Sequence, residues 1–173
     1  MIKLFTHTDL DGIGCAILAK LAFGTEVVDI EYCNYDDIDS KVEEYFNSGS
    51  EYECHITDIS INNELANKIS NSEKKYQLLD HHPTALGLNE FGWCNVQIEN
   101  EETNIKTSGT EMYYHWLINN NYLSKPCLLY SAKTLRIFSA GSITLDILTA
   151  WFMKSITLAV NLLMSAQEKY LRS

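Results

Sequence analysis

Apolar positions along the first two thirds of the chain follow two spacings, one typical of short buried strands and one typical of amphipathic helices. The runs that predict strands are Ile2–Thr6, Val27–Cys33, Tyr52–Thr57, Tyr76–Leu79 and Trp93–Ile98. The segments that predict helices are Asp11–Leu21, Asp36–Phe46, Asn62–Ser70 and Met112–Ile118, the last one preceded by a cap at Thr107–Glu111. In the first helix, the spacing predicts a buried face formed by Ile13, Ile17, Leu18 and Leu21.

Strands that alternate with helices in this way predict an α/β domain with an open, mainly parallel sheet and helices on both faces. A loop with Pro83, Gly87 and Gly92 is expected before the last strand. In such sheets ligands bind outside the carboxyl ends of the strands. The polar residues that follow each strand are therefore the first place to look for a functional site.

The pattern changes near Asn119–Asn121, and we divide the chain into a domain over residues 1–120 and a tail over residues 121–173. The segments Lys125–Phe138 and Ile143–Tyr170 predict a helical C-terminal tail. Residues 145–164 are strongly apolar, but Asp146 and Lys154 interrupt them and argue against a membrane span. We expect the tail to pack on the first domain or on a second copy, in a homodimer.

Charge is distributed unevenly between these two parts. Residues 1–120 contain 21 acidic and 7 basic residues, a net charge of -14, whereas residues 121–173 contain 2 acidic and 6 basic residues, a net charge of +4. An acidic body disfavours long-range attraction to a phosphate polymer, which argues against a processive exonuclease acting on long single strands. It suits a protein whose carboxylates hold divalent cations that neutralise a small anionic substrate.

The chain has 5 cysteines and no C-x-x-C pair. Without a recognisable signal peptide, this pattern predicts reduced thiols that fill the core of a cytoplasmic protein.

Metal-capable side chains follow three of the predicted strands. They are His7, Asp9 and Asp11 after the first strand, Asp58 after the third, and Asp80, His81 and His82 after the fourth. Each group alone has a simpler interpretation, as a polar turn with Asp11 capping a helix, a loop acid or a solvated loop. Together, at three strand ends, they predict a metal site. His55 and His115 lie away from these ends, and we interpret both as structural.

The chemistry of this set favours Mn²⁺, with Mg²⁺ as the alternative, because carboxylates and imidazoles are present without a thiolate. Two such ions about 3.5–4 Å apart can hold a hydroxide and clamp a phosphoryl oxygen during displacement. Asp58 is placed to bridge both ions. Pro83 restricts His82 to an extended backbone and so helps to orient its imidazole.

These motifs resemble the DHH phosphoesterase superfamily, which includes RecJ-type exonucleases, family II inorganic pyrophosphatases and small-oligonucleotide phosphatases. His7-Thr8-Asp9-Leu10-Asp11-Gly12 resembles the first family motif, Asp58 the second, Asp80-His81-His82 the signature, and Thr107–Glu111 the small-residue stretch before the next helix. The resemblance covers residues 1–120, the N-terminal DHH domain, and implies two Mn²⁺ ions.

Carried over residue by residue, the resemblance implies that His7 and Asp9 bind one ion and that Asp11 and His81 bind the other. Asp58 would bind both. Asp80 is expected in the metal and catalytic set, orienting the imidazoles, and His82 is expected to face the substrate phosphate or to act as an acid. With His82, the substrate-binding residues implied are Ser108, Gly109 and Thr110.

Two features depart from the family pattern. The later Asp that completes the second metal shell has no convincing counterpart, since the only acids of the tail are Asp146 and Glu168. A C-terminal substrate-binding domain is also missing, so a truncated or frameshifted tail is one hypothesis.

The predicted function is a metal-dependent phosphoesterase that hydrolyses short oligonucleotides, nucleotides or pyrophosphate by attack of a metal-bound hydroxide. The alternative is a non-catalytic or truncated metal-binding domain that acts as an interaction module or as part of a larger enzyme.

Overall fold

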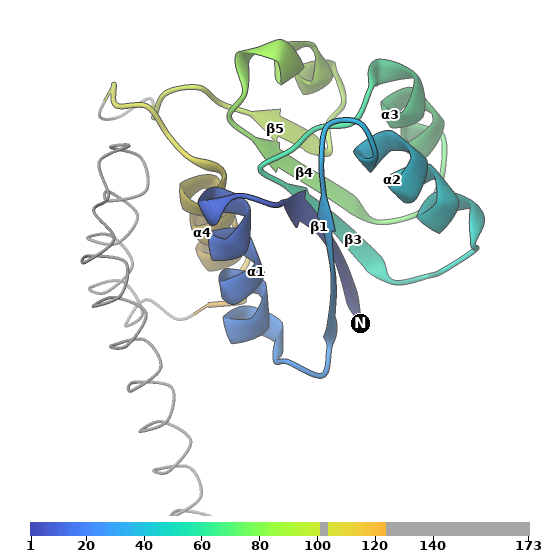
Figure 1. Cartoon of the computed structure of the whole chain (residues 1–173), viewed down its shortest axis with the longest axis horizontal. Coiled ribbons are helices and arrows are strands. Elements are labelled where there is room, and N and C mark those ends of the chain that lie inside the picture. The colour runs from blue at the N-terminus through green and yellow to red at the C-terminus, as the bar shows by residue number, and fades with distance from the viewer. Residues whose placement is uncertain (101–103, 124–173) are drawn as a thin grey trace, which may run out of the picture. The chain divides into compact units, whose positions relative to one another are not determined.

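A single open sheet forms the centre of the fold (Figure 1). The computed structural model describes residues 1–100 and 104–123. Its strands are β1 (Ile2–His7), β2 (Val28–Cys33), β3 (Glu53–Thr57), β4 (Tyr76–Asp80) and β5 (Cys94–Val96). They lie in the order β2-β1-β3-β4-β5, and every neighbouring pair is parallel. This arrangement confirms the predicted α/β fold.

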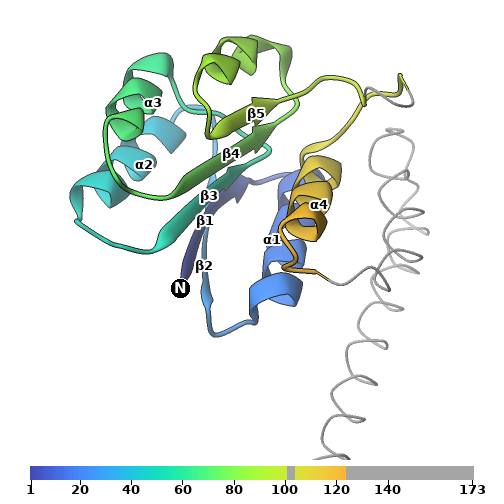
Figure 2. The same ribbon diagram turned by 180° about the vertical axis from the view of Figure 1, so that it is seen from behind.

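Helices cover both faces of this sheet, as the two opposite views show (Figures 1 and 2). On one face lie α1 (Leu10–Phe23) and α4 (Gly109–Asn119), which pack against each other. On the other face lie α2 (Ile38–Asn47), α3 (Asn63–Ser70) and the 3₁₀ helix η1 (Pro83–Glu90). Each layer buries its own apolar cluster, one around Phe5, Ile56 and Leu78 and the other around Leu4, Leu79 and Tyr113. The central strands β1, β3 and β4 are therefore buried on both sides, as is usual in parallel sheets, whereas the edge strand β2 is partly exposed.

The buried face of α1 differs from the prediction. Ile13 and Ile17 are each 39% exposed and Leu21 is 60% exposed, so of the expected stripe only Leu18 is buried. The helix instead buries small residues, among them Cys15, Ala16 and Ala19. Small residues are needed because α1 approaches its neighbours closely: a Cβ at Gly14 would collide with the side chain of Thr110 on α4. Close approach, rather than apolar spacing, therefore decides which face is buried.

The segment between β4 and β5 is more regular than the predicted loop. Pro83 occupies the first turn of η1, where its fixed φ suits a helix and its missing N–H is not needed. The side-chain amide of Asn89 then pairs with the backbone of Val96, at 2.7 Å and 2.9 Å. This pairing holds β5, which is shorter than predicted.

Several predictions fall on residues 124–173, outside the residues that the structure describes. They are the helices Lys125–Phe138 and Ile143–Tyr170, the apolar residues 145–164 and Cys127. Within the described part, Cys15, Cys33, Cys54 and Cys94 are buried and free. Among these same described residues, no helix combines the length and apolar character needed to cross a membrane.

Candidate metal centre at the carboxyl ends of the strands

The metal-capable residues of three strands lie at one edge of the sheet. β1, β3 and β4 are consecutive neighbours and parallel, so their carboxyl ends are adjacent. His7 is the last residue of β1, Asp58 follows β3 directly, and Asp80 is the last residue of β4. Sheet order thus brings together side chains that are far apart in the sequence.

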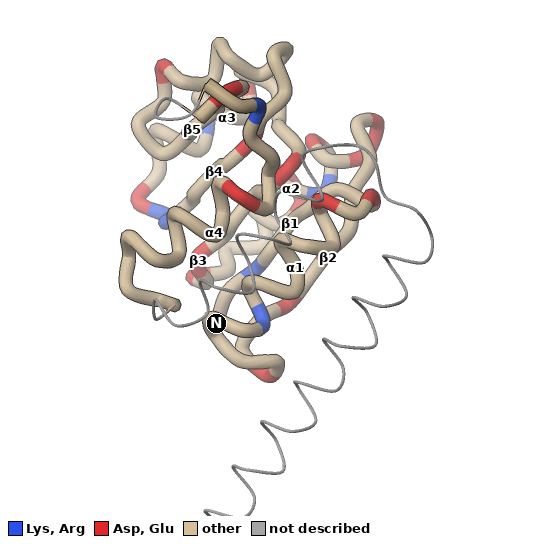
Figure 3. The backbone as a smooth tube through the Cα atoms, turned by 90° about the vertical axis from the view of Figure 1, so that its left-hand side faces the viewer, with Lys and Arg blue, Asp and Glu red and all other residues tan. Residues whose placement is uncertain are grey.

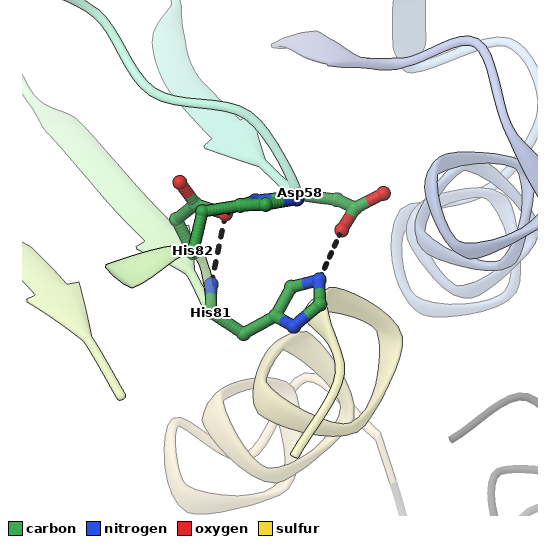
Figure 4. Close-up of side chains that lie close together, drawn as sticks. Asp58, His81 and His82 are labelled. Carbon is green, nitrogen blue, oxygen red and sulfur yellow. Dashed lines mark hydrogen bonds and ion pairs between the residues drawn. The ribbon is translucent and has the colours of Figure 1, made fainter. Parts of the chain in front are cut away.

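Asp58 is the most constrained of these residues. It is fully buried and has a φ of 60°, a left-handed conformation that Asp tolerates better than most residues. Figure 4 shows the imidazole of His81 directed at its carboxylate, with Nε2 of His81 3.1 Å from Oδ1. Burial, together with the negative charges of Asp11 and Asp9, raises the pKa of Asp58 to about 10. A carboxyl group in this setting needs either a proton or a cation.

Two groups of ligand atoms share Asp58. One consists of His7, Asp9 and Asp58, and the other of Asp58, Asp80, His81 and His82; within each group the ligand atoms lie within 4.8 Å of one another. This cluster of Asp and His is of the kind that can hold a metal ion.

Unpaired buried atoms in the first group support this interpretation. Oδ2 of Asp58 and Nδ1 of His7 are buried, and neither has a hydrogen-bond partner among the described residues. Nδ1 of His7 lies 2.9 Å from Oδ2 of Asp9, but the two atoms are not oriented for a hydrogen bond. Buried polar atoms are rarely left without a partner. A divalent cation would satisfy both, so the residues present fit a metal ion.

Asp9 has two roles at the start of α1. Its Oδ1 accepts hydrogen bonds from the backbone N–H groups of Asp11 and Gly12, both at 3.0 Å, which makes Asp9 the N-cap. The sequence had suggested Asp11 for this role. Gly12 is needed because a Cβ there would collide with the carbonyl group of His7. The helix therefore starts directly against the end of β1, and Oδ2 of Asp9 stays beside His7.

Asp11 belongs to neither group of ligand atoms and faces α4. Its two carboxylate oxygens accept hydrogen bonds from the backbone N–H groups of Gly109 and Thr110, both at 2.8 Å. The hydroxyl of Thr110 donates to the carbonyl of Asp11 at 2.7 Å. Oδ2 of Asp11 also lies 3.5 Å from Nε2 of His81. Asp11 thus joins α1 to α4 at the border of the centre, and metal binding by Asp11 stays a prediction.

Asp80 holds both residues that follow it. Its Oδ1 lies 2.7 Å from Nδ1 of His82 and accepts the backbone N–H of His81 at 2.8 Å, while the hydroxyl of Ser60 donates to Oδ2 at 2.6 Å. Burial alone would raise the pKa of Asp80, but the hydrogen bonds from His82 and Ser60 hold it below its ordinary value. The hydrogen bond to Asp80 raises the pKa of His82 against the opposing effect of burial.

The predicted substrate-binding residues at the start of α4 have structural contacts. The hydroxyl of Ser108 caps the helix by accepting the N–H of Glu111 at 3.1 Å. Gly109 packs against Asp58, and Thr110 binds Asp11. These contacts position two members of the centre, and a direct role in substrate binding stays a prediction.

Two residues that contact the centre were missed by the sequence analysis. The hydroxyl of Tyr35 lies 3.1 Å from Nε2 of His82, and Ser60 binds Asp80. Tyr35 follows the carboxyl end of β2, so the rule that selected the other strand ends would have found it. A search for Asp and His at the strand ends does not select a tyrosine.

The two remaining histidines lie outside the metal-capable groups. His55 is fully buried, with Nδ1 2.7 Å from the hydroxyl of Tyr113 and Nε2 3.1 Å from Glu53. His115 lies on α4, where its nearest acid is Glu111 at 3.9 Å. Hydrogen bonding accounts for the burial of His55 without a ligand.

The fold and the site together define a parallel α/β domain with an Asp/His cluster of metal-binding type at the carboxyl ends of its strands. The chain is homologous to Oligoribonuclease NrnB of Bacillus subtilis (strain 168), a DHH-family phosphoesterase, with 37% identity over 130 residues. This homology and the Asp/His cluster confirm the predicted resemblance to the DHH phosphoesterase superfamily. The alignment covers 71% of the chain and 32% of NrnB, so the chain spans about a third of the length of that relative.

The fold is also similar to that of a solved structure. It is an uncharacterized protein from Helicobacter pylori G27, with a TM-score of 0.55 and 21% sequence identity. The similarity covers 69% of this chain and 36% of the other. No family model matches the chain.

Proposed function

We propose that this chain is a metal-dependent phosphoesterase that hydrolyses short oligonucleotides, with nucleotides and pyrophosphate as further small substrates. The observation that carries the proposal is the position of Asp58, which is buried, shared by two groups of ligand atoms and left with an unpaired oxygen. Homology to an oligoribonuclease supports the substrate class.

We assign the ions to the residues that the family resemblance implies. His7, Asp9 and Asp58 would hold one, and Asp58, His81 and Asp11 the other, with Asp80 supporting the imidazoles. Carboxylates and imidazoles without a thiolate suit Mn²⁺, or Mg²⁺ as the alternative. The bound cations would supply Lewis-acid charge for the phosphate oxygens and lower the pKa of a nearby water.

In this proposal His82 transfers a proton, and its neighbours orient the imidazole. Asp80 holds Nδ1 of His82, so a substrate would contact Nε2, where it would replace the hydroxyl of Tyr35. Because Asp80 raises the pKa of His82, the ring keeps a proton nearer to neutral pH than an ordinary histidine does. A substrate phosphate at Nε2 would receive a hydrogen bond, and the leaving oxygen could take this proton.

The test is hydrolysis of di- to pentaribonucleotides by the purified protein with Mn²⁺, Mg²⁺ or EDTA. We expect turnover with Mn²⁺, none with EDTA, and a loss of at least about a hundredfold in Asp58→Asn. Glu51→Gln removes a carboxylate from an exposed position before the amino end of β3 and is the matched control. Equal turnover by Asp58→Asn and the unmodified protein would refute the assignment.

A second candidate function is a metal-binding domain without turnover, or one part of a larger enzyme. The observation that favours it is that Asp11, which is expected to hold the second ion, belongs to neither group of ligand atoms and binds the backbone of α4 instead. Calorimetry separates the two candidates, because uptake of Mn²⁺ without hydrolysis of any substrate supports the second. The predicted homodimer can be tested in the same preparation by sedimentation.

A further inference from the structure

We propose that a pocket beside the metal centre binds a phosphate next to the one that is cleaved, together with its nucleoside, and that Lys106 is the phosphate-binding group. The inference rests on the proposed function and extends it, because it assigns a place to the part of an oligonucleotide that does not react. Neither the predicted site residues nor the resemblance includes Lys106.

The pocket is continuous with the metal centre. Asp11, His81 and His82 line it together with Pro83, Ile98 and Lys106. Its volume is about 280 Å³, close to the lower limit of small-molecule sites. This space suits one nucleotide unit and would not enclose a longer strand.

Among the described residues that line the pocket, Lys106 is the only lysine or arginine. Acidic positions are spread over the whole α/β body, with few basic ones between them (Figure 3). Three of the other lysines form ion pairs: Lys3 with Asp29, Lys41 with Asp37 and Lys68 with Glu43. Lys106 has no ion-pair partner within residues 1–100 and 104–123. Among the described residues, the ammonium group of Lys106 thus has no competing carboxylate partner, and we expect it to bind a substrate anion.

The nearby helix terminus cannot take over this role. Backbone N–H groups at the start of a helix commonly bind phosphate. At the start of α4, however, the N–H groups of Gly109 and Thr110 already donate to Asp11, and that of Glu111 donates to Ser108. An anion bound near the start of α4 therefore needs a side chain as its hydrogen-bond donor, and Lys106 provides the positive charge.

The backbone around Lys106 is anchored by hydrogen bonds. Glu99 and Lys106 form an isolated antiparallel bridge. The N–H of Thr107 donates to the carbonyl of Ile98 at 3.0 Å, and the N–H of Asn100 donates to that of Ile105 at 2.8 Å. These contacts fix the backbone of Lys106 close to the start of α4. The apolar surfaces of Pro83 and Ile98 suit a ribose or base, whereas Lys106 suits the phosphate.

The first experiment compares dinucleotides that differ by one phosphate. Kinetics are measured with Mn²⁺ for diadenylate without a terminal phosphate, with a 5′-phosphate and with a 3′-phosphate. In Lys106→Ala, we expect KM for one of the phosphorylated forms to rise about tenfold more than KM for the unphosphorylated form. A tenfold change corresponds to the loss of about one charge-assisted hydrogen bond. Lys106→Arg keeps the charge and should retain most of the preference.

Lys20→Ala is the matched control, because it removes one positive charge from the exposed end of α1. If Lys106→Ala and Lys20→Ala change the three KM values alike, the inference is wrong. If Lys106→Ala raises KM for the 5′-phosphorylated form, the pocket lies on the 5′ side of the cleaved bond. If it raises KM for the 3′-phosphorylated form, the pocket lies on the 3′ side.

A second measurement does not require catalysis. Binding of adenosine monophosphate, with 5′- and 3′-phosphate isomers tested separately, is followed by calorimetry in the unmodified protein and in Lys106→Ala. Loss of binding in the variant supports the pocket even if no substrate is hydrolysed, in which case only the proposed function fails. Equal binding by both proteins overturns the inference whatever the kinetics show.

Discussion

The backbone of Gly109 lies directly against the side chain of Asp58. A Cβ placed on residue 109 would be 2.5 Å from Cβ of Asp58 and 2.7 Å from its Oδ1. Gly109 has an ordinary φ, so space rather than backbone conformation requires glycine here. The contact connects the start of α4 to the residue shared by both groups of ligand atoms.

Gly109→Ala should therefore disturb both folding and metal binding. We expect the free energy of unfolding to fall by about 1–3 kcal/mol, the usual cost of overpacking a buried site. We also expect the thermal shift produced by Mn²⁺ to shrink, because Asp58 must move to admit the new methyl group. Gly92→Ala is the control, since no atom lies within 4 Å of a Cβ at that position. Calorimetric unfolding of both variants, with and without Mn²⁺, checks this prediction, and equal behaviour of the two would contradict it.

Asp58→Asn should stabilise the protein when no metal is present. Burial and the nearby Asp11 and Asp9 raise the pKa of Asp58 from 3.8 to about 10. Between these values the folded state keeps a proton that the unfolded state has lost, so stability falls as pH rises through this window. Asn removes this titration, keeps the shape and tolerates a positive φ.

We expect Asp58→Asn in EDTA at about pH 8 to unfold with a free energy about 1–4 kcal/mol higher than that of the unmodified protein, and the difference to shrink at about pH 5. With Mn²⁺ the unmodified protein should be the more stable of the two, because only it offers the shared carboxylate to the ion. Chemical unfolding at the two pH values, with EDTA or Mn²⁺, is the measurement. A variant that is less stable than the unmodified protein in EDTA at both pH values would contradict the proposed environment of Asp58.

The pair formed by Asp80 and His82 has a stability window of its own. The lowered pKa of Asp80 means that its contribution is present above 3.8 and is lost as pH falls through the folded-state pKa. The raised pKa of His82 means that its contribution is complete below 6.5 and is lost as pH rises through the folded-state pKa. Both contributions are present together between these values.

Asp80→Asn should therefore reduce the free energy of unfolding by about 1–3 kcal/mol near pH 5 and by less near pH 9, where His82 is neutral. Unfolding in EDTA at both pH values checks this. Asp36→Asn, which removes an exposed carboxylate after β2, is the control. A loss that does not change with pH would mean that packing, rather than the charged pair, accounts for the effect of Asp80.

The sequence predicted the parts of this site that depend on periodicity. Strand ends can be identified from apolar spacing, and the carboxyl ends of parallel strands meet at one edge, so His7, Asp58 and Asp80 could be placed together before the structure was known. The hydrogen bonds of Asp11 could not be predicted in this way. Its partners Gly109 and Thr110 lie 98 and 99 positions away, and their N–H groups carry no side-chain signal.

The packing of α1 was beyond prediction for a related reason. Apolar spacing identifies a helix face only when large side chains fill the interface. Here α1 approaches β1 at Gly12 and α4 at Gly14, where no Cβ can be accommodated. Small residues are buried as a result, and Ile13 and Ile17 stay largely exposed. The spacing of large apolar residues therefore does not predict close contacts between elements.

Tyr35→Phe tests whether the hydroxyl of Tyr35 restrains His82. That hydroxyl lies 3.1 Å from Nε2 of His82, while Asp80 holds Nδ1, so both ring nitrogens have partners. Loss of one neutral hydrogen bond should lower kcat/KM about two- to tenfold. Tyr35→Ala should cost more, because it also removes the ring that lies 5.0 Å from that of His7.

Tyr52→Phe removes an exposed hydroxyl before the amino end of β3 and serves as the matched control. Nitrogen NMR of the His82 imidazole gives a measurement that is independent of turnover: the Nε2 resonance should move in Tyr35→Phe and stay in place in Tyr52→Phe. Identical spectra for the two variants would show that Tyr35 only lies beside His82. A shift confined to Tyr35→Phe would show that Tyr35 and Asp80 together fix the imidazole, leaving Nε2 to exchange its tyrosine partner for a substrate phosphate.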